Sequence, residues 1–248
     1  MLVTTSDQLK KITKSGEICK SALKKGLSFI KPGISTFELN KVVADYIKSQ
    51  GAKAAFYGYN AGEGPYPFET CICLNHQLVH AIPSKKVIIK SGDLVTIDVG
   101  VIYEGHYTDS AYTVEVNSAN EDYFLNTGKR SLKAAIKNAV VGKKIGDISS
   151  AMQKEVEASG FTVSLDLVGH GVGKALHEPP QIPCFGKKNT GQLLKEGEVL
   201  AIEVMYMKGK PALVLGEDGF SFDTKDKSLS AQFEHTIIVR DKKPQIIV

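Results

Sequence analysis

The sequence predicts an α+β fold in which two helices followed by antiparallel strands occur twice along the chain. One observation is the helical spacing of apolar residues in four segments, residues 6–30, 36–50, 121–140 and 145–160. Another is a set of short runs rich in β-branched and aromatic residues, typical of strands, at residues 70–74, 95–102, 107–114, 162–170, 199–208 and 231–239. The third is a weak similarity between Gly33-Ile34-Ser35-Thr36 and Asp147-Ile148-Ser149-Ser150. It indicates either a duplicated unit with halves of about equal size or only the shared chemistry of helix starts.

The first two helices have clear boundary signals. Ser6 is a candidate N-cap of the first helix, and Pro32-Gly33 ends it. Ser35-Thr36-Phe37-Glu38 has the pattern of a capping box, and Gly51 is placed as the C-terminal stop of the second helix. In the third helix Gly128 is expected to weaken the middle, and the fourth is expected to end at Gly160.

Residues 56–69, FYGYNAGEGPYPFE, form a predicted loop that is rich in glycine, proline and aromatic residues. It is too apolar to be only a spacer, and we expect it to line a pocket. The strand at 70–74 follows, and after it a turn at 75–83 carries His76 and His80.

Two aspartates lie inside the apolar hairpin formed by residues 95–102 and 107–114. A two-residue turn sets the predicted register, with Tyr103 opposite His106, Gly100 opposite Asp109 and Asp98 opposite Ala111. Asp98 and Asp109 are then diagonal neighbours with Cα atoms about 7 Å apart. The hairpin contains no Lys or Arg, so a divalent metal pair is the predicted counter-charge, with Gly100 leaving space for an ion. The alternative is that each aspartate caps a turn or lies at a frayed strand edge.

Further candidate ligands follow in the second half of the chain. His170 lies among alternating glycines, which suit close approach of the backbone to a ligand, and His177 precedes two prolines that hold its loop. Glu203 and Glu234 each interrupt an apolar run, where an unpaired charge costs several kcal/mol. A single histidine is more often packed or solvated than a ligand. The combined donor set nevertheless suits two ions of divalent Mn, Fe, Co or Zn, and its members are Asp98, Asp109, His170, Glu203 and Glu234.

Composition excludes several classes of protein. The 248 residues carry a formal net charge of +4, which is too weak to indicate direct nucleic-acid recognition. No signal-peptide run follows Met1 and no segment is apolar enough to span a membrane, so we expect a cytoplasmic protein without membrane contact. The four cysteines lack metal-type spacing, and we expect reduced, packed thiols rather than disulfides.

In its ordered set of motifs the chain resembles the type I methionine aminopeptidases. The segments that carry the resemblance are Asn75 to Pro83, Thr96-Ile97-Asp98-Val99, the Asp109 turn, Gly169 to Gly173, His177-Glu178-Pro179-Pro180, Ile202-Glu203 and Ser228 to Thr236. The resemblance covers nearly the whole chain. It implies the pita-bread fold, with pseudo-twofold halves around a curved antiparallel sheet and helices on its outer face, as a single catalytic domain of residues 1–248.

The resemblance also implies roles for the site residues. Asp98 would bind one metal, Asp109 and Glu234 would bridge both, and His170 and Glu203 would complete the other. Glu203 would also pass a proton as a bridging hydroxide attacks the scissile carbonyl. His177 would stabilise the oxygen that becomes negative, and His80 would bond at the scissile amide nitrogen. The α-amino group of the substrate would bind the second metal, which implies an exopeptidase.

The methionine pocket of the family corresponds to Tyr59, Tyr66, Cys71, His80, Leu176 and Phe220. The chain departs from the family pattern at Phe220, where Trp is frequent, at Leu176, where an aromatic is frequent, and at Val204, where Pro is usual. An apparent insertion also lengthens the loop at residues 61–65. Because the ligand set is untouched by these departures, we expect them to alter the shape of the pocket and the rate rather than the type of reaction.

The implied function is removal of the initiator methionine from nascent chains with a small second residue. Separately, we expect a monomer, and the mild positive charge is the basis of the hypothesis that it docks loosely near the ribosome exit. An enzyme rival is a prolidase or aminopeptidase P, which shares the fold and metal set but usually carries an extra N-terminal domain. A second rival is a non-catalytic peptide-binding or ribosome-associated relative. Such a relative is expected to have lost metal ligands, whereas this sequence keeps all five candidates and both histidines. In a third, the four carboxylates are ordinary surface charges on alternating strands.

Overall fold

The structure is a computed structural model that describes residues 1–62 and 64–248. The helices in these residues are α1 (Ser6–Phe29), α2 (Thr36–Ser49), α3 (Asp122–Lys137) and α4 (Ile145–Ala158). The strands of the first half are β1 (Lys53–Ala54), β2 (Cys71–Leu74), β3 (Gln77–Val79), β4 (Leu94–Tyr103) and β5 (His106–Glu115). Those of the second half are β6 (Thr162–Val163), β7 (Val168–Gly171), β8 (Glu178–Pro183), β9 (Val199–Met207), β10 (Leu213–Leu215), β11 (Phe222–Thr224), β12 (Ser230–Ile238) and β13 (Gln245–Ile246).

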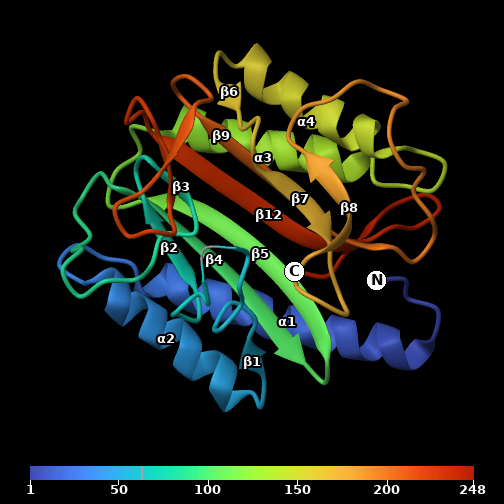
Figure 1. The fold of residues 1–248 in the computed structure, drawn as a ribbon, viewed down its shortest axis with the longest axis horizontal. Helices are drawn as coiled ribbons and strands as arrows, with labels where there is room; N and C mark the ends of the chain where they lie inside the picture. The colour runs from blue at the N-terminus through green and yellow to red at the C-terminus, as the bar shows by residue number, and fades with distance from the viewer. Residues whose placement is uncertain (63) are drawn as a thin grey trace.

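Two similar halves face each other across the molecule, as the α+β prediction requires. In Figure 1, α1 and α2 lie beside the β4–β5 hairpin, and α3 and α4 lie beside the antiparallel pair β9 and β12. Each pair of long strands is antiparallel, and the strand order in the second half is β13-β12-β9-β7-β8. The predicted helix-pair and strand-pair unit therefore occurs twice.

Side-chain alternation along the long strands separates the core from the candidate ligands. On β4, Ile97 and Val99 are fully buried against α1 and α2, whereas Asp98 points to the opposite face. On β9, Val204 packs into the core beside α3, and Glu203 points away from it. The helices thus cover the outer face of the strands, and the carboxylates gather on the inner face. Val204, one of the three departures from the family pattern, is fully buried in the core.

Side-chain hydroxyls join β5 to β12 where the two halves meet. Thr236 Oγ1 accepts from Asp109 N over 2.9 Å and donates to Asp109 O over 2.7 Å. Ser110 Oγ donates to Glu234 O over 2.8 Å. Because these bonds hold the two backbones together directly at the two acidic residues, they bring Asp109 and Glu234 into one site.

The register predicted for the hairpin is confirmed. Asp98 lies opposite Ala111, Gly100 opposite Asp109, and Tyr103 opposite His106. Each strand is longer than predicted by two residues, one at each end. All four cysteines are free and buried, which agrees with the packed thiols predicted from the sequence.

The helix starts show one confirmed prediction and two wrong ones. Ser35 and Glu38 form the predicted capping box at α2, with Ser35 N donating to Glu38 Oε2 over 2.8 Å. The N-cap of α1 is Thr5, not Ser6, because the Thr5 side chain accepts from Gln8 N. Asp147 lies inside the first turn of α4, where its carboxylate accepts from Lys144 N over 2.9 Å. Since the start of α2 at Thr36 corresponds to the start of α4 at Ile145, the proposed repeat was aligned five residues too late.

Gly128 does not interrupt α3. A Cβ atom at this position would lie 2.5 Å from Phe233 Cδ2, so the glycine lets the helix approach the sheet closely. The predicted strand at 162–170 is divided into β6 and β7. None of the helices in the described residues is long and apolar enough to cross a membrane.

Candidate metal centre and substrate pocket

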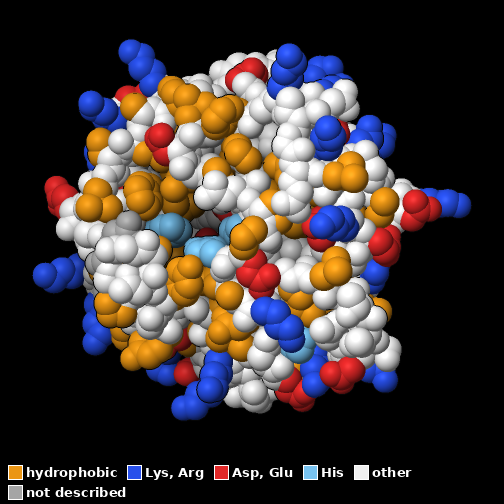
Figure 2. Space-filling model, turned by 45° about the vertical axis from the view of Figure 1, so that its right-hand side comes forward, with side chains coloured by type: hydrophobic (Ala, Val, Ile, Leu, Met, Phe, Trp, Pro, Cys, Tyr) orange, Lys and Arg blue, Asp and Glu red, His pale blue; other side chains and the backbone are white. Residues whose placement is uncertain are grey.

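A cavity of about 580 Å³ opens between the two halves. Figure 2 shows histidine side chains inside a hollow with hydrophobic side chains around it. The cavity is lined by all twelve residues predicted from the sequence, which are Tyr59, Tyr66, Cys71, His80, Asp98, Asp109, His170, Leu176, His177, Glu203, Phe220 and Glu234. The two halves therefore bring the whole predicted set to one place.

Three of the five predicted metal ligands meet closely. One potential ligand atom each of Asp109, His170 and Glu234 lies within 4.8 Å of the others. The three residues come from β5, β7 and β12, and all are buried. Asp98 and Glu203 lie outside this close group, although both line the same cavity.

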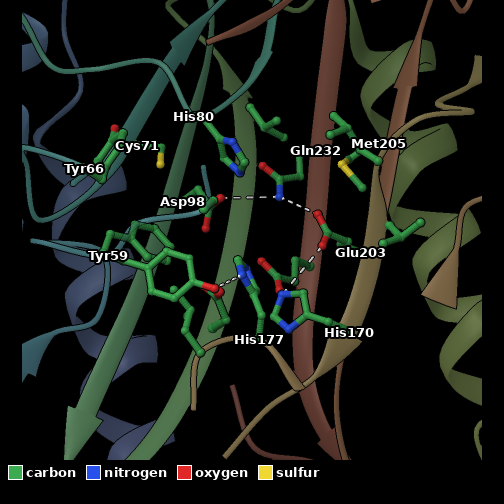
Figure 3. Close-up of a pocket in the computed structure, with 18 of the residues that line it drawn as sticks. Tyr59, Tyr66, Cys71, His80, Asp98, His170, His177, Glu203, Met205 and Gln232 are labelled. Carbon is green, nitrogen blue, oxygen red and sulfur yellow. Dashed lines mark hydrogen bonds and ion pairs between the residues drawn. The ribbon is translucent and has the colours of Figure 1, made fainter. Parts of the chain in front are cut away.

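Gln232 connects the remaining two carboxylates. Its Nε2 atom donates to Glu203 Oε2 over 2.9 Å and lies 3.5 Å from Asp98 Oδ2 (Figure 3). Gln232 is not among the site residues predicted from the sequence. A signal was present, because Gln232 stands two residues before Glu234 and so shares its face of β12.

Burial raises the pKa of every carboxyl group in the cluster. Loss of solvent raises the pKa of Asp98 to about 7, and loss of solvent together with the Asp98 charge raises that of Glu203 to about 8. The pKa values of Asp109 and Glu234 are raised well above the usual range, again first by burial and then by neighbouring carboxylates. Such mutual repulsion calls for a compensating cation.

The donor set fits divalent metal ions. Asp98 Oδ1 and Glu234 Oε1 are buried without a hydrogen-bond partner, and no Lys or Arg is among the described residues that line the cavity. Carboxylate oxygens with one imidazole are donors that Mn, Fe, Co and Zn accept. The residues of this site therefore match the metal use that the sequence predicts.

His170 presents one nitrogen to the cluster. Its Nδ1 lies 3.0 Å from Gly171 O and donates to it, which leaves Nε2 as the ligand atom, 3.9 Å from Glu203 Oε1. Burial lowers the pKa of His170 to about 3, so the imidazole is neutral and able to bind metal.

The glycines near these ligands have a different role from the one predicted. A Cβ at Gly169 would lie 2.7 Å from Ala201 O, and one at Gly171 would lie 2.3 Å from Pro179 O, so they admit neighbouring backbone rather than a ligand. Gly100 leaves no open space for an ion, because a Cβ there would lie 2.8 Å from both Ala55 Cβ and Phe56 Cε1.

Two further histidines reach the cavity. The His177 ring packs edge-on against His170 with centroids 4.4 Å apart, and its Nδ1 lies 2.7 Å from the Tyr59 hydroxyl. Burial lowers the pKa of His177, so this imidazole is also neutral. His80 follows β3 with a φ of 62°, which turns the chain sharply, and Figure 3 shows its ring above Asp98.

The predicted methionine pocket is an apolar wall beside the carboxylates. Tyr66 packs edge-on against Phe220 with centroids 5.5 Å apart, and its hydroxyl lies 2.9 Å from Ala81 O. Cys71 and Leu176 are buried in the same cluster, and burial raises the pKa of the Cys71 thiol, which stays uncharged. The predicted insertion at residues 61–65 includes residue 63, which lies outside the described residues, while Ala61 and Gly64 line the cavity.

Comparison with known proteins gives a consistent set of relatives. The model of metallopeptidase family M24 matches residues 10–241. The methionine aminopeptidase of Aquifex aeolicus is 39% identical over 97% of this chain and 95% of its own. A crystal structure of methionine aminopeptidase from Thermotoga maritima superposes with a TM-score of 0.95 at 37% identity, over 100% of this chain and 99% of that one. The prolidase from Pyrococcus furiosus has a TM-score of 0.78 at 25% identity, over 99% of this chain and 65% of the prolidase.

Proposed function

The chain belongs to metallopeptidase family M24, and we propose that it hydrolyses the peptide bond after an N-terminal methionine, preferably before a small second residue. The fold is the pita-bread fold of the methionine aminopeptidases and prolidases that it superposes on. The proposal rests mainly on one observation: a single cavity is lined on one side by buried carboxylates and imidazoles and on the other by aromatic rings and a thiol.

We assign the metal-holding role to five residues and expect two divalent ions per chain. In this assignment Asp98 would hold one ion, His170 and Glu203 would hold the other, and Asp109 and Glu234 would serve both; all five residues line the cavity. When bound, such ions lower the pKa of a water molecule and polarise the scissile carbonyl. The raised pKa values of the carboxyl groups in the metal-free protein support this assignment.

Three side chains have proposed roles in the proton movements. The Glu203 carboxylate, which would be ionised when it holds metal, accepts the proton of the attacking water, because it lines the cavity beside the imidazoles. The neutral His177 imidazole donates a hydrogen bond to the carbonyl oxygen as negative charge develops on it. His80 forms a hydrogen bond at the scissile amide nitrogen, and its ring position above Asp98 supports this role.

The apolar wall sets the proposed side-chain preference. Methionine is unbranched and polarisable, so it fits a pocket of aromatic rings and a neutral thiol. The proposed lining residues are Tyr59, Tyr66, Cys71, His80, Leu176 and Phe220. Phe220 fills its position with an edge-on contact to Tyr66, so a phenyl ring closes this end of the pocket.

The proposal extends to the setting of the reaction. We expect residues 1–248 to act as a single catalytic domain and as a monomer on nascent N-termini in the cytoplasm, where chains emerge from ribosomes. The mild positive charge favours loose docking near the exit tunnel, and salt-sensitive co-sedimentation with ribosomes would test it.

A Xaa-Pro-directed activity is the competing proposal. The TM-score of 0.78 with the prolidase against 0.95 with the Thermotoga maritima methionine aminopeptidase favours methionine removal. The two activities differ in the peptide they accept, so a single substrate panel separates them.

The test is release of free amino acids by chelator-stripped protein after addition of Mn, Fe, Co or Zn separately. We expect metal-restored release of methionine from Met-Ala-Ser, much less from Met-Leu-Ser, and none from Ala-Pro. Cleavage of Ala-Pro without cleavage of Met-Ala-Ser would favour the Xaa-Pro-directed activity. No cleavage by protein with bound metal would contradict both.

A further inference from the structure

The hydroxyl of Tyr59 and the imidazole of His177 form a direct contact inside the cavity. Tyr59 OH lies 2.7 Å from His177 Nδ1, and the two rings meet edge-on with centroids 4.9 Å apart (Figure 3). The second pocket tyrosine behaves differently, because the Tyr66 hydroxyl bonds to the backbone carbonyls of Thr70 and Ala81. One tyrosine therefore fixes the pocket wall, and the other reaches a proposed catalytic histidine.

The backbone around Tyr59 holds the phenol in place. Gly58 N donates to Tyr66 O over 2.8 Å, and Tyr66 N donates to Tyr59 O over 2.7 Å, so the two ends of the lengthened loop are paired. Within the loop the Asn60 side chain accepts from the backbone of Gly62 and Gly64. Tyr59 is thus fixed at the base of a closed loop.

Phe56 anchors the same segment to the metal-binding hairpin. Tyr59 N donates to Phe56 O over 2.9 Å, and the Phe56 ring lies where a side chain on Gly100 would be. Gly100 is two residues from Asp98 on β4. The absent side chain of Gly100 therefore allows the loop to sit against the strand that carries a metal-binding residue, and this contact places the Tyr59 hydroxyl.

We propose that Tyr59 is a positioning residue that donates its hydroxyl proton to His177 Nδ1 and so fixes the imidazole with its hydrogen on Nε2. A neutral imidazole carries one hydrogen, on either nitrogen, and the partner of one nitrogen decides which. With Nδ1 accepting from the phenol, Nε2 is the nitrogen that donates to a ligand in the cavity. This inference rests on the proposed function, in which His177 donates to the substrate carbonyl oxygen.

A direct test measures the tautomer and needs no substrate. In protein labelled with ¹⁵N at its histidines and loaded with Zn, His177 signals are assigned by their loss in His177→Ala. At pH 8 we expect wild type to show hydrogen on Nε2 and Tyr59→Phe to show a mixture of both tautomers. Tyr57→Phe is the matched control, because Tyr57 is in the same loop but is 65% exposed and lines no part of the cavity. An unchanged His177 tautomer in Tyr59→Phe would overturn the proposal.

A double-mutant cycle separates positioning from simple lining of the pocket. With Met-Ala-Ser, Tyr59→Phe is expected to lower kcat about 10-fold with little change in KM, the effect of one lost hydrogen bond to a catalytic group. In the His177→Ala background the same change is expected to have no further effect on kcat. An equal loss in both backgrounds would show that Tyr59 acts on the substrate directly and would contradict the proposal.

The two readouts keep the inference distinct from the proposed function. A Tyr59-dependent tautomer in a protein that releases no methionine would leave the positioning role standing and remove the assigned reaction. Methionine release by a protein whose His177 tautomer does not depend on Tyr59 would support the assigned reaction and contradict the positioning role.

Discussion

The side-chain amide of Gln232 donates a hydrogen bond of 2.9 Å to the carboxylate of Glu203. The same nitrogen lies 3.5 Å from Asp98, on the strand pair of the other half. One neutral donor therefore contacts two carboxylates that both have raised pKa values. Since metal-binding side chains depend on such outer partners for their orientation, Gln232 is expected to govern metal affinity without binding metal itself.

Replacement of Gln232 by Leu is expected to weaken metal binding about 10- to 100-fold, because both carboxylates lose the donor that orients them. The volume of the side chain is nearly kept, so the fold should persist. Competition with a chromophoric chelator measures the affinity. Gln192→Leu, an exposed position, serves as the control, and equal affinities for the two variants would rule out this role of Gln232.

The number of bound ions tests the assignment of the ligands. Asp98→Asn and His170→Ala are each expected to lower the metal content from two ions to about one, since they belong to different ions in the assignment. Glu234→Gln removes a shared ligand and is expected to reduce both. Elemental analysis after dialysis measures the content, and one ion in the unaltered chain would contradict the dinuclear assignment.

The stability of the metal-free protein should fall as pH rises from about 6.5 to 8.5. In the folded state the pKa of Asp98 is raised to about 7 and that of Glu203 to about 8. At any pH between the pKa of a carboxyl group in the unfolded chain and its raised pKa in the folded state, the folded protein binds more protons than the unfolded chain. Stability from this source is complete at low pH and is lost as pH rises through the raised values. The neutral histidines act in the opposite direction, but mainly below pH 6.5, where their unfolded forms become charged.

Urea unfolding of metal-free wild type and of the Asp98→Asn/Glu203→Gln protein measures this effect. Relative to the variant, wild type is expected to lose about 1 to 3 kcal/mol across the window, since one pKa unit corresponds to about 1.4 kcal/mol. Added Zn should restore wild type and leave the variant nearly unchanged. Parallel pH profiles of the two proteins would show that these carboxyl groups do not titrate as described.

Local pattern was enough to predict the hairpin and the positions of its two aspartates. A strand alternates its side chains and a two-residue turn fixes the pairing, so the positions of Asp98 and Asp109 follow from sequence spacing alone. The capping box at Ser35 is equally local. Both features depend on residues that are close in sequence, since Asp98 and Asp109 are 11 positions apart and Ser35 and Glu38 are three apart.

Contacts between distant segments could not be predicted in the same way. A side chain at position 100 would collide with the ring of Phe56, which lies 44 positions earlier in the chain. The hydrogen-bond partners of Gln232 lie on β4 and β9. The role of Gly128 depends on Phe233 in the same manner. From sequence alone a glycine indicates backbone flexibility. Its role in close packing becomes visible only when the neighbouring atoms that fill the space of a side chain are known. The hydrogen bonds of the Thr236 and Ser110 hydroxyls that join β5 to β12 could not be predicted from strand propensity either, because Thr and Ser are ordinary strand residues.

Asp218 is expected to shape the methionine pocket although it lines no part of the cavity. Its Oδ1 accepts from Phe220 N over 3.0 Å and from Ser221 N over 2.7 Å, and its Oδ2 accepts from Ile82 N over 3.1 Å. The carboxylate thus ties the loop of Phe220 to the segment that follows His80. Without it the phenyl ring loses its fixed place beside Tyr66, and binding of the methionine side chain should suffer more than the chemical step.

Asp218→Ala removes all three hydrogen bonds and is therefore expected to raise KM for Met-Ala-Ser about 5- to 10-fold while kcat changes less than 2-fold, because only part of the free energy of these bonds reaches substrate binding. Asp218→Asn keeps an acceptor oxygen and should recover most of the loss. Asp226→Ala is the matched control, since Asp226 also accepts from backbone amides, at Lys210 and Ser228, but outside the cavity. A kcat that falls with unchanged KM in Asp218→Ala would mean that the tie positions His80 rather than Phe220, because only the histidine is assigned to the chemical step.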